Sequence, residues 1–436
     1  MNSDIESSDI ILITVDCWRD DATEYMDNMQ EYVNKNGFQR KTVTTHAAAT
    51  AWSTPSLLAG QHFPNVLELQ SDSIQSSEIP MVDENANVLP QLLSEAGYET
   101  AAFIGDNPYL EMWEPFFDTW SNESKPIING MENLPSKLNS LFHLGLQKKK
   151  APASHLVNKA LDWIEETDSP RFVWVHLMEP HGPYYAGLSE AWNNGLLKTY
   201  QTFYTQGTNT RQELVESNKY NEFRHQLQNL YNSTNKILDS SVVRLLSACS
   251  SDTKIYLTAD HGEEFSDEWY GHSRPYDDCI KVPFYTNVDP TQDNISRHVE
   301  IASEILAQEE IKPPKNWKRA AEYSEDCSFI IHPSIHGYGQ LFVGCRTPNY
   351  HYLQLRSPTD GHIENEELYQ GSAFTKSKKD ISEDEEKKTA ELRQKVDIFI
   401  DDFEIDIEHY TTIGRGAKEN VDENVSARLE ELGYID

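Results

Sequence analysis

Two short segments combine acids, a histidine and small residues in patterns that suit a divalent cation. Asp16 directly follows one apolar run, and Asp260 and His261 directly follow another. A carboxylate at the end of a buried strand is costly unless it is paired or bound to metal. Gly262 allows a tight turn, so that both preceding side chains can reach one ion. Asp16, Asp260 and His261 are therefore predicted ligands of Mg, Ca, Mn or Zn.

A third segment, THAAATAWSTPSLLAG at residues 45–60, offers a hydroxyl nucleophile. Its small residues, hydroxyl cluster and apolar run predict a tight turn that opens a helix, and a helix N-terminus stabilises an anion. Thr50 is the hydroxyl that we predict to act there as nucleophile and metal ligand. Ser53 and Thr54, ahead of Pro55, are interpreted as helix caps.

Further polar side chains follow other apolar runs. His181 lies in a predicted loop, where an acid that protonates a leaving oxygen is useful, and His272 precedes Arg274, so that both could face the site. His176, inside an apolar run, is interpreted as a core histidine. Asn107 either lines the pocket or turns the chain.

The elements that position these residues are short, continuous β-branched runs that alternate with helical stretches. Strands are predicted over 10–15, 100–104, 171–177 and 254–258, and helices before Gly97, around 160–166 and around 230–248. This alternation predicts an α/β fold with a mainly parallel sheet flanked by helices. Ligands of open α/β sheets bind beyond the carboxyl ends of the strands, where these polar residues lie.

Beyond about residue 320 the pattern changes to short strands and charged helices. Residues 328–332, 341–345 and 350–355 predict a small antiparallel layer, 380–394 a charged helix with a solvated face, and 425–432 a final amphipathic helix. The predicted domains are 1–320 (catalytic), 321–375 (antiparallel subdomain) and 376–436 (charged helical tail). A helical insertion or cover is predicted over 185–224.

The charge of the chain is strongly negative. Asp and Glu number 71 against 37 Lys and Arg, which gives a net charge of −34. Such a surface repels nucleic acid and anionic membranes, and it fits either the solvation seen in salt-loving organisms or an acidic partner-binding role. Bound metal and local cations must reverse this field for an anionic substrate. Arg19 and Lys281 are either cations that bind the anionic substrate or ordinary surface charges.

The five cysteines are widely spaced and include no CxxC pair, so neither a disulfide framework nor a zinc knuckle is predicted. The N-terminal segment has acids before a short apolar run rather than a basic start with a cleavage site. No run reaches about 18 apolar residues, which predicts no membrane span. A cytoplasmic location is the default expectation.

Taken together, these motifs resemble the sulfatase family within the alkaline-phosphatase superfamily. ILITVDCWRDD, TADHGEEF and WVHLMEPHGPYY resemble its metal-binding and substrate-side segments, and LLSEAGYETAAFIGDN, GHSRPYDDCIKVPF and EELY resemble segments around them. The resemblance runs from about residue 8 to 375. It implies an alkaline-phosphatase-like fold, metal ligands at Asp16, Asp260 and His261, the nucleophile at Thr50, His181 beside the leaving group, and His272 as a second such histidine or a metal ligand.

Three positions depart from the family pattern. Thr50 stands where sulfatases carry the Cys or Ser that becomes formylglycine, Thr54 where an Arg supports it, and Cys17 where many have a second metal-binding Asp. The aldehyde route is therefore not available. The resemblance to phosphodiesterase, phosphoglycerol-transferase and phosphoethanolamine-transferase branches, which use Thr, favours phosphoryl over sulfuryl chemistry.

Three functions stay open at this point. The first is hydrolysis of a phosphate or sulfate ester of a small molecule or glycan through Thr50. The second is transfer of the phosphoryl group from the same residue to a glycan or lipid hydroxyl. The third is a catalytically degenerate binding protein, which the departures at Thr54 and Cys17 support. The oligomeric state is open as well.

Overall fold

The computed structural model describes most of the chain. The described residues are 8–68, 80–123, 151–168, 170–184, 187–206, 211–291, 295–323, 327–333, 340–357, 360–371, 379–407 and 410. The predicted helix over 425–432 lies outside them. Within the described residues, no helix has both the length and the apolar character needed to cross a membrane.

A seven-stranded sheet with the order β2-β11-β8-β1-β7-β5-β6 forms the centre of the molecule. Its strands are β1 (Ile10–Val15), β2 (Gln39–Thr44), β5 (Glu99–Ile104), β6 (Thr119–Asn122), β7 (Arg171–Leu177), β8 (Lys254–Ala259) and β11 (Lys281–Thr286). All neighbours pair in parallel except β11, which is antiparallel to both β8 and β2. The predicted mainly parallel α/β sheet is thus confirmed.

Strand β1 lies in the middle of this sheet, and all six of its residues are buried. Its last residue, Val15, pairs with Leu177 at the end of β7 and with Ala259 at the end of β8. The three central strands therefore end at the same level. Residues that follow them, including Asp16 and Asp260, emerge side by side at one edge of the sheet.

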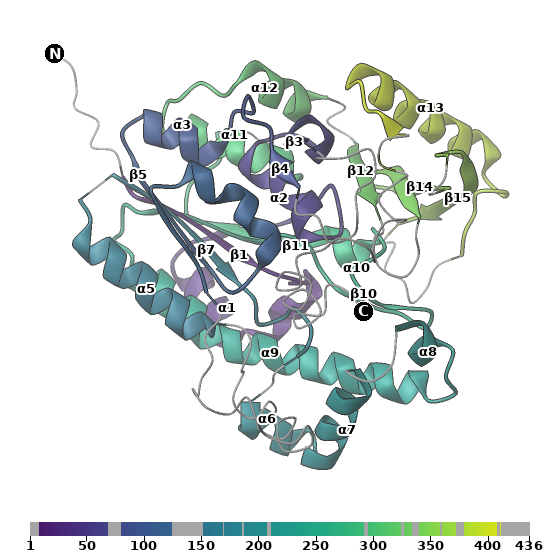
Figure 1. Cartoon of the computed structure of the whole chain (residues 1–436), viewed down its shortest axis with the longest axis horizontal. Coiled ribbons are helices and arrows are strands. Elements are labelled where there is room, and N and C mark those ends of the chain that lie inside the picture. The colour runs from purple at the N-terminus through teal and green to yellow at the C-terminus, as the bar shows by residue number, and fades with distance from the viewer. Residues whose placement is uncertain are drawn as a thin grey trace.

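Helices cover both faces of the sheet (Figure 1). On one face lie α1 (Asp27–Lys35), α5 (Ala153–Glu166) and the long α9 (Tyr220–Ala248); on the other lie α2 (Thr50–Leu58), α3 (Leu89–Glu95), α11 (His298–Gln308) and α12 (Lys315–Glu322). Shorter elements connect them: η1 (Asp21–Tyr25), η2 (Phe63–Asn65), η3 (Pro108–Phe116), α10 (Asp277–Ile280), and the strand pairs β3 (Leu67–Glu68) with β4 (Met81–Val82) and β9 (Glu264–Phe265) with β10 (Tyr270–Gly271).

The predicted insertion over 185–224 is helical in its described residues. It contains α6 (Gly187–Asn193), α7 (Leu196–Gln206) and α8 (Arg211–Val215), and α9 begins within it. Helix α7 packs along α9, which extends past the edge of the main sheet (Figure 1).

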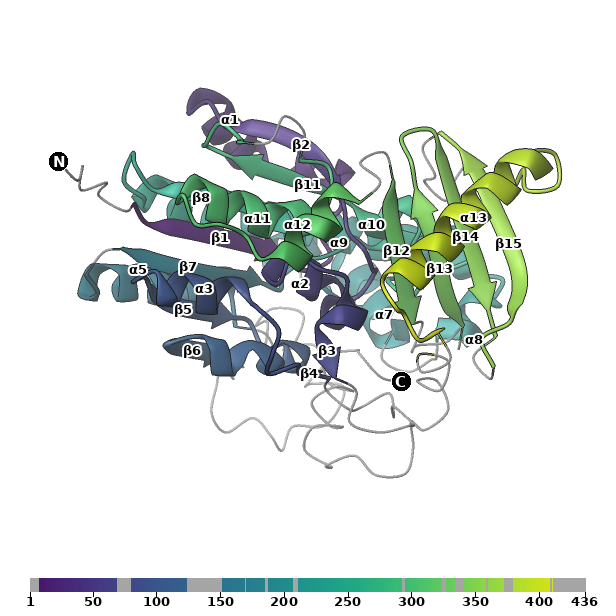
Figure 2. The same cartoon turned by 90° about the horizontal axis from the view of Figure 1, so that it is seen from above.

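A four-stranded antiparallel sheet lies at the end of the main sheet where β1 and β7 finish (Figure 2). It contains β12 (Ser328–Pro333), β13 (Leu341–Arg346), β14 (Tyr350–Arg356) and β15 (Ile363–Gln370) in sequential order. The first three strands were predicted, whereas β15 was not, because its run of acidic residues hides a strand. The domain boundaries stay predictions.

Helix α13 (Glu386–Asp402) begins later and runs further than the predicted charged helix over 380–394. It crosses the antiparallel sheet (Figure 2) and buries Leu392, Val396 and Phe399. The predicted solvated face is present, since Lys387 and Glu391 are exposed. The opposite side carries an apolar stripe at helical spacing, which was not predicted and which packs on the sheet.

Candidate active site

The ends of β1 and β8 bring two carboxylates together. Asp16 and Asp260 are both fully buried. The backbone N–H of Asp16 donates to the Leu177 carbonyl at 2.9 Å, which extends the sheet pairing to this residue. Asp260 Oδ1 accepts bonds from the N–H groups of Cys17 (3.3 Å) and His261 (2.8 Å). The two acids are thus fixed by the backbone of the turns that follow the strands.

Thr50 is the first residue of α2, and its hydroxyl points at the same place. Its Oγ1 lies 3.4 Å from Asp16 Oδ2 and 3.3 Å from His261 Nε2. Ala49, the residue before the helix, has extended backbone and makes no side-chain cap. The N-terminus of α2 therefore faces the acids, where its dipole favours an anion.

His261 presents a defined nitrogen to this group. Its Nδ1 donates to the Gly262 carbonyl at 2.9 Å, so that in the neutral imidazole the lone pair lies on Nε2. Nε2 lies 3.8 Å from Asp16 Oδ1 and 3.5 Å from Asp260 Oδ2. Gly262 is required at the turn because a Cβ would lie 2.2 Å from the Asp278 carbonyl oxygen. The structure thus brings Asp16, Thr50, Asp260 and His261 together.

The two acids have opposite pKa shifts. Burial would raise the pKa of Asp16, but the imidazoles of His181, His176 and His261 outweigh it and hold that pKa well below its usual range. Burial and the Asp16 carboxylate raise the pKa of Asp260. The pKa of His261 is raised because the carboxylates of Asp260 and Asp16 outweigh the effect of burial. Two adjacent buried carboxylates repel each other, and a cation between them would relieve this repulsion.

The donor set fits a divalent cation. Asp16, His176 and Asp260 each place a ligand atom within 4.8 Å of the other two, and so do Asp16, Cys17 and His261. All five residues are buried. Carboxylate oxygen and imidazole nitrogen are ligands that Mn, Zn and related ions accept.

His176, which was interpreted as a core histidine, and Asn107, whose role was left open, both lie in this cluster. His176 is not a plain core histidine, because its Nε2 lies 3.4 Å from Asp16 Oδ2 while Thr14 Oγ1 holds its Nδ1 at 2.7 Å. Asn107 donates from Nδ2 to Asp16 Oδ2 at 3.2 Å and accepts from Tyr109 N. It thus turns the chain into η3, and its place in a substrate pocket stays a prediction. The position of His176 near the end of β7, level with Thr14, was the available signal.

His181 and His272 lie together on the adjoining side. Their ring centroids are 5.2 Å apart, and the ring of His272 is 4.7 Å from that of His261. His272 Nδ1 is 3.6 Å from Cys17 Sγ and 3.3 Å from Glu263 Oε1. Glu263, which the sequence analysis did not single out, is the residue that follows Gly262 in the TADHGEEF motif.

The structure changes the predicted roles of Ser53, Thr54 and Arg19. Ser53 and Thr54 do not cap the helix, because α2 begins at Thr50 and their hydroxyls donate to the Thr50 carbonyl inside it. The Arg19 guanidinium binds the carboxylates of Asp21 and Asp278 at 2.7 and 2.9 Å. It is therefore part of a structural ion-pair network.

The remaining cationic candidates are held by acids as well. Arg274 pairs with Glu264, and Lys281 Nζ lies 3.2 Å from Asp277. Pairing with a carboxylate reduces the net positive charge that a side chain can offer to an anion.

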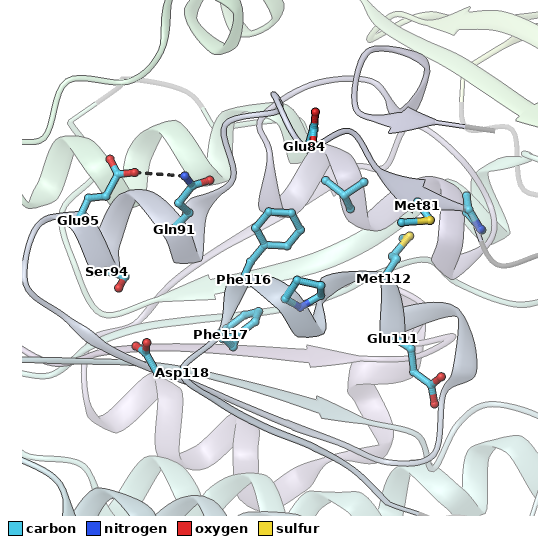
Figure 3. A pocket seen from close by; sticks show the side chains of 13 residues that line it. Met81, Glu84, Gln91, Ser94, Glu95, Glu111, Met112, Phe116, Phe117 and Asp118 are labelled. Carbon is cyan, nitrogen blue, oxygen red and sulfur yellow. Dashed lines mark hydrogen bonds between the residues drawn. The ribbon is translucent and has the colours of Figure 1, made fainter. Parts of the chain in front are cut away.

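A cavity of about 810 Å³ lies apart from these residues, between β4, α3 and η3. Figure 3 shows Met81, Met112 and Phe116 gathered in it, with Glu95 bonded to Gln91 at its margin. None of the site residues lines it. The cavity and the buried polar cluster are therefore separate features of the molecule.

Comparison with known proteins gives one family and several structural neighbours. A family model described as Sulfatase matches residues 8–306. No curated protein matches the sequence. The fold is similar to that of a protein solved in complex with its substrate, D-glucosamine-2-N,6-O-disulfate. The superposition of the two structures has a TM-score of 0.66 and 16% sequence identity. It covers 93% of this chain and 99% of the other.

Two further neighbours share the fold. A putative sulfatase from Bacteroides thetaiotaomicron has a TM-score of 0.64 and 16% identity, with 96% of each chain covered. The phosphonate monoester hydrolase of Silicibacter pomeroyi has a TM-score of 0.66 and 13% identity, with 91% of this chain and 96% of the other covered. Both matches cover more than nine tenths of each chain.

Proposed function

Because this chain belongs to the sulfatase family of ester hydrolases, we propose that it hydrolyses phosphate or sulfate esters with Thr50 as nucleophile and a divalent cation as cofactor. The observation that carries the proposal is the position of the Thr50 hydroxyl, 3.4 Å from Asp16 Oδ2 and 3.3 Å from His261 Nε2. A threonine buried at a helix N-terminus beside an acid and an imidazole is the arrangement of an activated hydroxyl.

Asp16, Asp260 and His261 would hold the cation, with Thr50 as a further ligand. A divalent cation there supplies charge that lowers the pKa of a hydroxyl and stabilises an anionic ester. The Thr50 oxygen attacks the phosphorus or sulfur atom, an O–P or O–S bond forms, and the bond to the alcohol breaks. Thr50 loses its proton in this step and the departing alcohol takes one up. Water then splits the threonine ester, which restores the Thr50 hydroxyl and releases phosphate or sulfate.

Thr50 favours a phosphate ester over a sulfate ester as substrate. The formylglycine route of sulfatases needs Cys or Ser at this position, whereas a threonine hydroxyl suits phosphoryl transfer. Among the structural neighbours, one is a phosphonate monoester hydrolase and one was solved with a sulfated sugar, which supports both classes.

The experiment is hydrolysis of nitrophenyl phosphate, bis-nitrophenyl phosphate and nitrophenyl sulfate after reloading of the purified protein with Mg, Ca, Mn or Zn. Thr50→Ala is expected to lower kcat/KM by a factor on the order of 10³ or more, because a nucleophile acts as a unit with its activators. Thr50→Ser, which keeps a hydroxyl, is expected to retain measurable activity.

Ser53→Ala is the matched control, since Ser53 is equally buried on the same helix and donates to the Thr50 carbonyl. It is expected to change kcat/KM by less than about tenfold. Unchanged turnover in Thr50→Ala would remove Thr50 as the nucleophile. A metal-loaded protein that hydrolyses none of the three esters, while binding one of them, would instead indicate the degenerate binding protein.

A further inference from the structure

Cys17, His181, Glu263 and His272 form a second cluster of metal-ligating side chains beside the first. All four are buried, and they come from four segments: the turns after β1 and β7, the turn before β9, and the residue after β10. The thiol of Cys17 and the imidazoles of His181 and His272 place ligand atoms within 4.8 Å of one another.

Two separations in this cluster match those of neighbouring ligands in a tetrahedral site. His272 Nδ1 lies 3.6 Å from Cys17 Sγ and 3.3 Å from Glu263 Oε1. Around zinc, with bonds of about 2.3 Å to sulfur and about 2.0–2.1 Å to nitrogen or oxygen, tetrahedral neighbours are about 3.6 Å (S to N) and about 3.4 Å (N to O) apart. Sulfur and imidazole ligands select zinc over magnesium or calcium.

The backbone of Cys17 is fixed for this role. Its φ is 58°, in the left-handed region that residues with a Cβ seldom adopt. Its N–H donates to Asp260 Oδ1 at 3.3 Å, and its carbonyl accepts from the Tyr231 hydroxyl at 2.8 Å. Two bonds from distant parts of the chain thus hold the turn that carries both Asp16 and Cys17.

The buried negative charge of the two clusters is large enough to balance two divalent cations. Asp16, Asp260 and Glu263 are buried, and the ion-pair partners described for Asp260 and Glu263 are the imidazoles of His261 and His272. A divalent cation bound by Asp16 and Asp260 would balance these two carboxylates, and it would leave the Glu263 carboxylate paired with the imidazole of His272. A second divalent cation would displace the proton of the Cys17 thiol, and the Glu263 carboxylate and the resulting thiolate would then balance its charge.

We propose that Cys17, His181, Glu263 and His272 bind a second divalent cation, a zinc ion, next to the centre of Asp16, Asp260 and His261. The proposal requires neither ester hydrolysis nor Thr50, and it goes beyond the proposed function in this respect. An imidazole nitrogen that binds a cation carries no proton there. His181 and His272 therefore act as ligands instead of as acids for the leaving group.

The test uses the full-length protein, stripped of metal and reloaded with Co²⁺ as a spectroscopic probe. The wild type is expected to show a thiolate-to-cobalt charge-transfer band and to retain two equivalents of metal by mass spectrometry. Cys17→Ser is expected to lose the band and to retain about one equivalent, because the thiolate is the only sulfur ligand of the proposed site.

Two variants make the result specific. Cys279→Ser removes another fully buried thiol near the site and is expected to keep the band. Asp260→Asn is expected to lower the metal content at the first centre while the band persists, which separates the two sites. A wild type loaded with cobalt but without the band, or a band that survives in Cys17→Ser, overturns the proposal.

X-ray absorption on the zinc-loaded wild type gives an answer that needs no variant to fold. One sulfur neighbour at about 2.3 Å is expected among nitrogen and oxygen neighbours. A zinc environment without sulfur contradicts the proposal, and the buried cluster is then held by hydrogen bonds alone. Neither measurement uses turnover, so failure here is distinct from failure of the Thr50 hypothesis.

Discussion

At the scale of single residues, Thr50 differs from a serine in ways that matter for its proposed role. Its β-branched side chain has few χ1 rotamers, so the hydroxyl is held in place by the helix that begins with it. Asp16 shares its carboxylate among several neighbours, accepting from Asn107 and from Thr50. Each of these contacts crosses between separate segments, and the position of the hydroxyl therefore depends on several elements at once.

The first residue-scale prediction concerns metal affinity. Asp260→Asn combined with His261→Ala is expected to reduce affinity for the cation at the first centre by about 10²-fold or more, because ligand substitutions exceed the 10–100-fold effects of outer-shell changes. Isothermal titration of the stripped protein with Mn²⁺ measures this. Asp239→Asn is the control, since Asp239 is a buried carboxylate that accepts from Asn28 and Met29 backbone N–H groups instead. Equal affinity in the double variant and the control would contradict the ligand assignment.

At the scale of elements, the site depends on strand ends and helix starts. Strands β1 and β8 end in register, which places Asp16 beside Asp260. Helix α2 is held by contacts on its N-terminal side: the Ile331 N–H donates to the His46 carbonyl at 3.1 Å, and the Ala48 N–H donates to His332 Nδ1 at 3.3 Å. Strand β12 of the antiparallel sheet thus supports the segment that leads to Thr50.

The second prediction tests how α13 is attached. Phe399 is almost fully buried and stacks on Phe329 of β12 with ring centroids 4.1 Å apart. Phe399→Ala is expected to lower the free energy of unfolding by about 3–5 kcal/mol, since a large buried ring leaves a cavity. Urea denaturation measures the loss. Ile398→Ala, at a neighbouring position that is 47% exposed, is expected to cost less than about 1 kcal/mol. Equal effects of the two substitutions would show that α13 does not pack as described.

The third prediction is a pH dependence from buried histidines between α2 and α13. Burial lowers the pKa of His46 to about 3 and holds the pKa of His62 well below its ordinary value. The unfolded chain therefore binds more protons than the folded one between about pH 6.5 and 3. Stability is present above the unfolded pKa and is lost as pH falls through this window, by about 1.4 kcal/mol per unit for each histidine.

Urea midpoints between pH 7 and 4 measure this slope. His62→Phe, which keeps a ring against Phe399 and Phe403, is expected to flatten it. His362→Ala, at a side chain that is 61% exposed, is expected to leave it unchanged. A slope that is the same in the wild type and in His62→Phe would contradict this origin of acid sensitivity.

The sequence predicts the parallel core well because β1, β5, β7 and β8 are continuous apolar runs, and such runs are typical of strands buried on both faces. Strands β2 and β15 escape prediction because they are rich in charged and polar residues, and their pairing comes from distant partners. The motifs indicate Asp16, Thr50, Asp260 and His261, and the structure brings them together. His176 and Glu263 were missed because their contacts depend on the register of β7 and on the turn after Gly262.

At the scale of the whole molecule, the net charge of −34 opposes the approach of an anionic ester. The cationic side chains of Arg19 and Arg274 are paired with carboxylates, so within the described residues the proposed cations carry much of the local positive charge. Long-range repulsion then reduces the rate of encounter, and dissolved salt screens it over distances beyond the Debye length.

The fourth prediction follows from this field. With KCl raised from about 0.01 M to about 0.15 M, the Debye length falls from about 30 Å to about 8 Å, and kcat/KM for nitrophenyl phosphate is expected to rise. The rise is expected to be smaller for bis-nitrophenyl phosphate, which carries one negative charge instead of two. A kcat/KM that falls with salt for both substrates would show that attraction by the site dominates over repulsion by the surface.

The hydrogen bond from Ile331 to His46 has a consequence for how the protein matures. A nascent chain that stops before β12 already contains every proposed ligand and the proposed nucleophile, yet the segment ahead of α2 still lacks the strand that braces it. Catalytic competence would then arrive late in synthesis, after the last parallel strand has been made. A chain that ends before β12 would then have a folded central sheet but no hydrolytic activity.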